Sequence, residues 1–113
     1  AGQVHGGVAQ GVGQALMEDV TYDRDGQILA GSFLDYCMPR ADDLPMIHTS
    51  DFVEACQTNP LGVKGGGESG TVGSTAAVVN AIVDALSDYG VKDIDMPVSP
   101  LRVWQAMQGG KAA

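Results

Sequence analysis

A single carboxylate, Glu68, lies in a stretch with six glycines, Gly62-Val-Lys-Gly-Gly-Gly-Glu-Ser-Gly-Thr-Val-Gly73, and the next charge is Asp84. Because glycine has no Cβ, such a loop can adopt positive φ and lets a ligand approach the backbone closely. The apolar run that follows predicts a helix whose free N–H groups and positive dipole end face the loop. That dipole and Lys64 favour the ionised form of Glu68, whereas burial favours the neutral form. A carboxylate held between these effects suits a general base.

Two other interpretations of this stretch compete with a catalytic one. In the first, Glu68 only stabilises the helix as an acidic residue near its start, an effect worth about 0.3–1 kcal/mol. In the second, Gly65-x-Gly67-x-x-Gly70 is a dinucleotide-binding fingerprint. No buried strand precedes it, and Glu68 would meet the anionic pyrophosphate at the helix end. The local sequence leaves the first interpretation open and disfavours nucleotide binding.

Composition excludes several classes of partner. The 113 residues carry 14 Asp+Glu against 6 Lys+Arg, a formal net charge of −8, so the clustered cations that nucleic acids and anionic lipids require are absent. No apolar run reaches the roughly 20 residues that cross a bilayer. Cys37 and Cys56 are expected to be buried, reduced thiols of a cytoplasmic protein. His5 and His48 lie too far from each other and from paired cysteines for a zinc site, so no metal ligand is predicted.

Helices are expected on both sides of the glycine loop. Apolar residues recur every four positions over residues 3–19, and the opposite face carries Gln3, Gln10 and Gln14. Four glycines inside this helix cost about 1 kcal/mol each relative to alanine, and such a conflict with periodicity marks close approach by another group. Gln10 and Gln14 are interpreted first as a solvated face.

The second helix is predicted over residues 71–89. It is apolar over most of its circumference, so it is expected to be buried against several neighbours, and Gly90 provides its stop. Ser99 and Pro100 predict the start of a last helix, as N-cap and first helical residue. Residues 109–113 are expected to fray.

Short strands are predicted between the first two helices. Residues 20–22 and 27–30 flank Asp23-Arg-Asp-Gly26, a hairpin loop in which Gly26 is available for the left-handed conformation. Residues 47–56 are predicted as a third strand. The expected fold class is α+β, a small mixed domain with a short antiparallel sheet and two to three helices. Three short strands do not cover two long apolar helices, so further protein is expected to bury the remainder.

Two segments together resemble the C-terminal part of the molybdenum hydroxylase large subunit, the family of xanthine dehydrogenase, aldehyde oxidase and aerobic carbon monoxide dehydrogenase. They are Gly2-Gln-Val-His-Gly-Gly-Val-Ala-Gln-Gly-Val-Gly-Gln-Ala-Leu16 and Leu61-Gly-Val-Lys-Gly-Gly-Gly-Glu-Ser-Gly-Thr71. The resemblance covers residues 1–113 as one segment of a larger molybdopterin-binding domain, because the family's large subunit is several times longer. Tyr22-Asp-x-Asp-Gly26, Asp35-Tyr36 and Pro39 are most similar to the carbon monoxide dehydrogenase branch.

The resemblance implies roles for individual residues. Glu68 matches the family's active-site glutamate, the base that takes a proton from a hydroxyl on the molybdenum. Gln3 matches the glutamine that hydrogen-bonds the molybdenum cofactor, Gly66 and Gly67 match the backbone that lines the metal face, and Lys64 matches a loop lysine.

The resemblance also implies cofactors and partners. These are molybdopterin as its cytosine dinucleotide, with FAD and 2Fe-2S clusters on partner subunits. The substrate is then carbon monoxide, an aldehyde, a purine or another heterocycle. Because the chain holds one side of such a site, it is expected to be inactive alone. The competing hypothesis is a non-catalytic interaction module, in which Glu68 and Gln3 lie far apart or are covered by the chain's own side chains.

Overall fold

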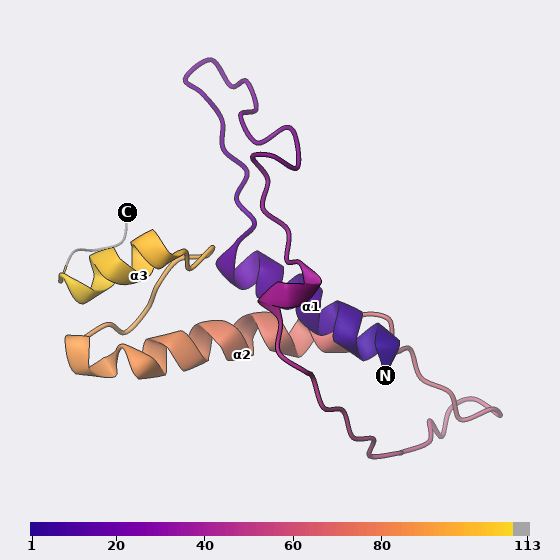
Figure 1. Cartoon of the computed structure of the whole chain (residues 1–113). Coiled ribbons are helices and arrows are strands. Elements are labelled where there is room, and N and C mark those ends of the chain that lie inside the picture. Colours follow the sequence, from indigo (N-terminus) through magenta and orange to yellow (C-terminus); the bar gives the residue numbers. More distant parts are fainter. Residues whose placement is uncertain (110–113) are drawn as a thin grey trace.

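The computed structural model describes residues 1–109 (Figure 1). These residues form three α-helices and two short 3-10 turns, which are α1 (Gly2–Leu16), η1 (Ala41–Asp43), α2 (Ser69–Ala85), η2 (Ser87–Tyr89) and α3 (Pro100–Met107). Both long helices lie where they were predicted. The first ends three residues early, and the end of the second tightens into η2, which Gly90 closes with φ 75°. The fraying predicted for residues 110–113 lies outside the described residues.

The predicted α+β fold is wrong, because the described residues are helical with almost no strand. The expected hairpin is present only as a turn with one antiparallel bridge, between Tyr22 and Ile28. Its turn is as predicted, with Gly26 at φ 79° and two backbone N–H groups bonded to Asp23 Oδ1 at 2.9 and 2.8 Å. An isolated two-stranded hairpin is marginal in water, so the predicted strands do not extend beyond this bridge.

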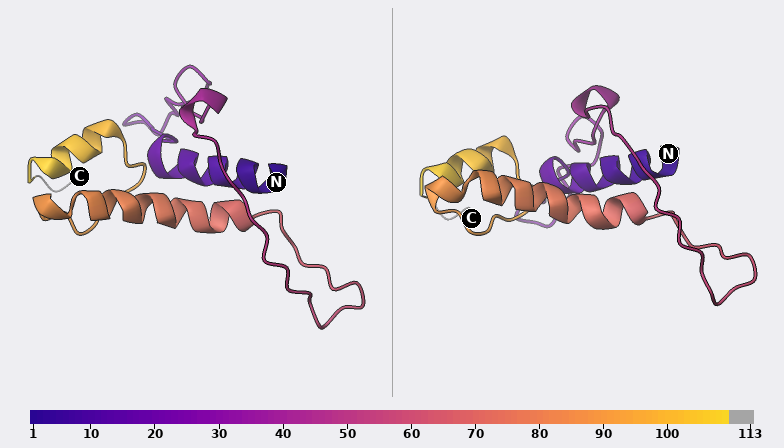
Figure 2. Two further views of the ribbon diagram at one scale, coloured as in Figure 1. Left: turned by 60° about the horizontal axis from the view of Figure 1, so that its bottom comes forward. Right: turned by 90° about the horizontal axis from the view of Figure 1, so that it is seen from below.

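Residues 47–56, predicted as the third strand, carry no regular secondary structure. Phe52 and Val53 within this segment are 94% and 90% exposed. An extended segment becomes a strand only when a neighbour pairs with its backbone N–H and C=O groups. Within the described part of the chain, this segment passes into a long loop that projects from the helices, as Figure 2 shows.

Helices α1 and α2 lie side by side with their N-terminal ends together (Figures 1 and 2). Their backbones approach so closely that a Cβ on Gly70 would lie 2.5 Å from the carbonyl oxygen of Val4. A Cβ on Gly7 would lie 3.0 Å from the Cα of Gly70. The conflict between glycine content and helical periodicity in α1 therefore has the predicted cause, close approach of another group, although Gly6 faces open space.

The last helix begins as its sequence predicted. The Ser99 side chain accepts a hydrogen bond from the N–H of Arg102, and Pro100 occupies the first helical position. Just before this cap, the N–H of Val98 donates to the carbonyl of Ala15, at 2.6 Å, near the end of α1. This bond ties the segment that leads into α3 to the first helix.

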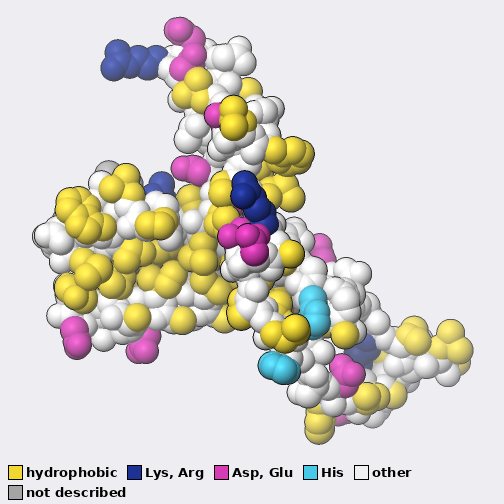
Figure 3. Space-filling model, viewed as in Figure 1, with side chains coloured by type: hydrophobic (Ala, Val, Ile, Leu, Met, Phe, Trp, Pro, Cys, Tyr) yellow, Lys and Arg dark blue, Asp and Glu magenta, His cyan; other side chains and the backbone are white. Residues whose placement is uncertain are grey.

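The chain exposes much of its apolar surface. Its accessible area is 8612 Å², about 2800 Å² more than a folded monomer of 11.6 kDa has. Its radius of gyration is 17.6 Å, against about 13 Å for a compact domain of this length. Figure 3 shows apolar side chains gathered over the α2 and α3 part of the molecule. Within the described residues α2 packs mainly against α1, and its Val72 is 76% exposed, so the predicted burial of α2 against several neighbours is not reached within this chain.

Candidate functional site

The glycine loop and the first turn of α1 meet at the N-terminal end of the helix pair. The Gln3 side chain donates from Nε2 to the carbonyl of Gly67 at 2.9 Å. Two further bonds join the helices, from Thr71 Oγ1 to the Gly7 carbonyl at 2.8 Å and from Thr75 Oγ1 to the Gly11 carbonyl at 3.4 Å. Each of the three bonds joins residues 64 positions apart. The helices therefore run parallel in a single register, and both positive dipole ends point toward the site.

Glu68 is the N-cap residue of α2, with φ −108° and ψ 5°. Its side chain makes no capping hydrogen bond, and the residue is exposed. Glu68 can therefore stabilise α2 only through the attraction of its charge to the helix dipole, because its side chain makes no bond to the backbone. The carboxylate is left available to a group outside this helix.

The three central glycines of the loop present open backbone. Gly65, Gly66 and Gly67 are exposed, and a Cβ on any of them would meet nothing within 4 Å. None of the three has positive φ, which in this loop occurs only at Gly62, at 66°. The predicted conformational role of glycine therefore holds for Gly62 alone. At the other three positions, this chain leaves room for a group to approach the backbone.

Asn59 organises the turn that leads into the glycine loop, and the sequence analysis did not identify it. Its side chain accepts from the N–H groups of Leu61 and Val63 and donates to the carbonyl of Val63 at 2.9 Å. The available signal was the Asn59-Pro60 dipeptide, because an asparagine before proline favours turn initiation.

The remaining polar candidates are Gln10 and Gln14 along α1 and Lys64 in the glycine loop. Thr71 Oγ1 also lies 3.3 Å from Gln10 Oε1, so Gln10 contacts α2 rather than standing only on a solvated face. Lys64 and Gln14 are exposed. No three metal-ligating side chains come together within residues 1–109.

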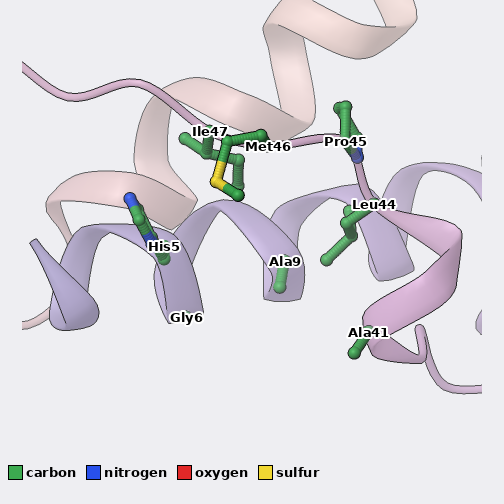
Figure 4. A pocket seen from close by; sticks show the side chains of 8 residues that line it. All are labelled: His5, Gly6, Ala9, Ala41, Leu44, Pro45, Met46 and Ile47. Carbon is green, nitrogen blue, oxygen red and sulfur yellow. The ribbon is translucent and has the colours of Figure 1, made fainter.

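His5 lines a hollow of about 410 Å³ on another face of α1. Figure 4 shows its ring beside Met46 and Ile47, with Leu44 and Pro45 further along the helix. His5 is half-buried and His48 is exposed. A larger hollow, of about 720 Å³, lies between the end of α1 and α3 and has a mostly apolar lining that includes Trp104.

Outside the site, two side-chain hydrogen bonds shift the pKa values of ionisable groups. The Tyr36 hydroxyl donates to Glu18 at 2.7 Å, and this bond raises the pKa of Tyr36. Cys56 Sγ lies 3.2 Å from the Thr58 hydroxyl, which lowers the pKa of the Cys56 thiol. Both cysteines are free thiols as predicted, but Cys37 is exposed and Cys56 is only half-buried, so the prediction of buried thiols is wrong.

A membrane-spanning helix is not found among the described residues, because none of their helices combines sufficient length with sufficient hydrophobicity.

Comparisons with known proteins agree with the two motifs that meet here. Residues 1–45 match the family model of the molybdopterin cofactor-binding domain. The nicotine 6-hydroxylase large subunit of Paenarthrobacter nicotinovorans is 41% identical over 108 residues, which cover 96% of this chain and 13% of that protein. The carbon monoxide dehydrogenase large chain of Hydrogenophaga pseudoflava is 36% identical over 107 residues, which cover 95% of this chain and 13% of that protein.

A solved structure shows the same arrangement of the backbone. Quinoline 2-oxidoreductase from Pseudomonas putida 86 superposes with a TM-score of 0.89 at 38% identity, covering 95% of this chain and 14% of that one. The chain thus spans only 13–14% of the length of these relatives. The names of the first two, a large subunit and a large chain, mark them as parts of multi-subunit enzymes. The chain belongs to the molybdenum hydroxylase large subunits, the family that includes carbon monoxide dehydrogenase and xanthine dehydrogenase, and corresponds to a small segment of their molybdopterin-binding part.

Proposed function

We propose that this chain forms one wall of the active site of a molybdenum hydroxylase. In this proposal Glu68 is the catalytic base, and Gln3, Gly66 and Gly67 face the molybdenum cofactor. The observation that carries the proposal is the 2.9 Å bond from Gln3 Nε2 to the Gly67 carbonyl. It joins the two motifs at one end of the molecule, next to the carboxylate.

The residues at this end fit a molybdopterin cofactor. The Gln3 amide uses one N–H on Gly67, which leaves its second N–H and its carbonyl oxygen for a ligand. Open backbone at Gly65, Gly66 and Gly67 admits a flat group without meeting a side chain. When bound, the cofactor supplies the redox chemistry, and the protein supplies binding, orientation and a base.

Glu68 then has one task, which is to hold and release a proton at a carboxylate oxygen. Its side chain is not engaged in capping α2, so accepting a proton breaks no helix-capping bond. Gln3 holds the preceding peptide group through Gly67 and thereby limits where the carboxylate can lie. This chain leaves Glu68 exposed, so excluding water from the base is a task for the protein that covers the site.

The proposal extends to the rest of the enzyme. Residues 1–113 would form a single C-terminal segment of a molybdopterin-binding large subunit that is inactive alone. The cofactor would be the cytosine dinucleotide form, and partner subunits would carry FAD and 2Fe-2S clusters. Identity to a nicotine hydroxylase is 41% and to a carbon monoxide dehydrogenase 36%. The proposal therefore stays at the level of molybdenum hydroxylase chemistry.

The alternative, a non-catalytic interaction module, requires Glu68 and Gln3 to be far apart or covered. Gln3 instead bonds to the residue next to Glu68, and both side chains are exposed. This arrangement favours the catalytic proposal.

The test is Glu68→Gln in the complete large subunit, assembled with its partner subunits. Because general-base catalysis contributes about 10²–10⁴-fold, turnover should fall at least about a hundredfold while the molybdenum content stays unchanged. Glu54→Gln is the matched control, an exposed carboxylate in the projecting loop, and it should retain full activity. A Glu68→Gln enzyme with most of its turnover would remove the base assignment.

A further inference from the structure

Three hydrogen bonds join α1 to the end of the glycine loop and to α2, and the first of them lies at the proposed site. They join Gln3 to Gly67, Gly7 to Thr71 and Gly11 to Thr75, each pair 64 positions apart. Successive bonds are about one helical turn apart along α1, and the second and third are equally spaced along α2. The Thr71 bond is the first of the three that a side chain of α2 makes, because the bond before it uses the Gly67 carbonyl of the loop.

We propose that Thr71 is a positioning residue, whose hydroxyl sets the place of Glu68 relative to Gln3. The inference rests on the proposed function of Glu68. Thr71 is the third residue of α2, and Glu68 is the N-cap residue of that helix. The Thr71 backbone and the Glu68 backbone therefore move together as one helical turn, so a bond that holds Thr71 also holds the carboxylate.

The Thr71 hydroxyl joins the first turn of α2 to α1 by a hydrogen bond of defined direction. Its hydroxyl has one hydrogen and two acceptors in reach, the Gly7 carbonyl at 2.8 Å and Gln10 Oε1 at 3.3 Å. Both acceptors belong to α1, on the turns that follow Gln3. The bond is part-buried, so water competes for it less than for an exposed contact.

Van der Waals contacts between the helices do not by themselves fix the position of the first turn of α2 relative to α1. The glycines bring the helices together, but dispersion contacts between them are individually weak and have no preferred direction along the helix axis. A hydrogen bond also resists separation and sliding along the helix axis. Without the Thr71 hydroxyl, the first turn of α2 stays in contact with α1 but loses the bond that limits its sliding along the helix axis.

Thr75 provides a matched control within the same helix pair. Its hydroxyl lies 3.4 Å from the carbonyl of Gly11 and 3.4 Å from the carbonyl of Thr71, and it lies one turn further from Glu68 than Thr71 does. Thr75→Val removes the same chemical group from the same interface as Thr71→Val. If the hydroxyls only stabilise the helix pair, both substitutions should lower kcat equally. If Thr71 positions Glu68, Thr71→Val should lower kcat more than Thr75→Val does.

The experiment compares Thr71→Val, Thr71→Ser, Thr75→Val and Glu68→Gln in the complete assembled enzyme, with rates expressed per molybdenum bound. A misplacement of 1 Å costs about a hundredfold in rate, and the looser turn of Thr71→Val should lower kcat about tenfold with KM unchanged. Thr71→Ser retains the hydroxyl and should restore kcat to within about twofold. Thr75→Val should also stay within about twofold. Independently of activity, hydrogen exchange at the amides of residues 72–75, whose N–H groups bond within the first turns of α2, should be faster in Thr71→Val and unchanged in Thr71→Ser.

Different outcomes separate this inference from the proposed function. An inactive Glu68→Gln enzyme beside a Thr71→Val enzyme with normal kcat overturns the positioning role alone. Equal losses in Thr71→Val and Thr75→Val also overturn it, because they report only general destabilisation. Retained activity in Glu68→Gln overturns both proposals. Unchanged exchange at residues 72–75 in Thr71→Val overturns the proposal that the Thr71 hydroxyl holds the start of α2.

Discussion

The substitution Gly70→Ala tests how closely the two long helices must approach each other for full turnover. An added Cβ would lie 2.5 Å from the Val4 carbonyl oxygen and 2.7 Å from the Val8 backbone nitrogen. Both neighbours are backbone atoms inside α1, so no side chain can rotate away. The helices themselves have to separate at this point.

The size of the separation follows from these distances. Ordinary contact begins at 3.4 Å, so the N-terminal end of α2 must move by about 0.9 Å. Overpacking of this kind costs about 1–3 kcal/mol, and the gain in helix propensity from glycine to alanine offsets about 1 kcal/mol of it. A displacement near 1 Å beside a catalytic group costs about a hundredfold in rate. We therefore expect a modest loss of stability together with a loss of turnover of about one hundredfold.

The assay is steady-state turnover per molybdenum in the complete enzyme, together with thermal unfolding. Gly73→Ala is the control, because Gly73 lies on the same helix and a Cβ there meets nothing within 4 Å. That variant should keep full turnover and gain about 0.5–1 kcal/mol in stability. Wild-type turnover in Gly70→Ala would show that the contact between the helix backbones does not place the site.

Three further predictions concern single side chains. Gln3→Leu removes the bond to Gly67 and should lower the molybdenum content of the purified enzyme several-fold. Gln14→Leu is the control and should leave the molybdenum content unchanged. Equal molybdenum contents in the two variants would argue against a cofactor role for Gln3. Tyr36→Phe removes the bond to Glu18. Since the folded-state pKa of Tyr36 is raised above 10.0, its stabilising contribution is complete below pH 10 and is lost as the pH rises through the raised value. The difference in Tm between the wild type and Tyr36→Phe should therefore shrink only above pH 10, and a shrinkage at neutral pH would contradict this. Ser99→Ala removes the N-cap of α3 and should destabilise that helix by about 1 kcal/mol. Hydrogen exchange at the amides of residues 101–107 measures this loss, and Ser99→Thr is the variant that keeps the cap.

Features that depend on neighbouring residues could be predicted from the sequence. The Ser99 cap, the Gly26 turn and the Gly90 stop all occur as expected, because each needs only a few adjacent residues to satisfy its backbone groups. The two long helices follow from their apolar periodicity for the same reason. The pair of motifs was sufficient to indicate the family.

The strands could not be predicted correctly from the same local signals. The β-branched and aromatic residues over 47–56 describe a segment that is able to pair, but pairing requires a second strand. Tyr22 and Ile28 find each other across a tight turn, whereas Phe52 and Val53 remain exposed. A strand is a property of two segments, so one segment alone does not determine it.

The sequence by itself determined where the two long helices lie, to within a few residues at their ends, and it singled out Glu68 and Gln3 as residues able to serve one site. Only the tertiary structure decided that they meet, through a bond from Gln3 to Gly67 across 64 positions. It also explained why Gly7 and Gly70 are glycines, since their Cβ atoms would overlap the facing helix. The physical reason is that helix formation depends on contacts within a few residues, whereas the register between two helices depends on atoms far apart in the chain.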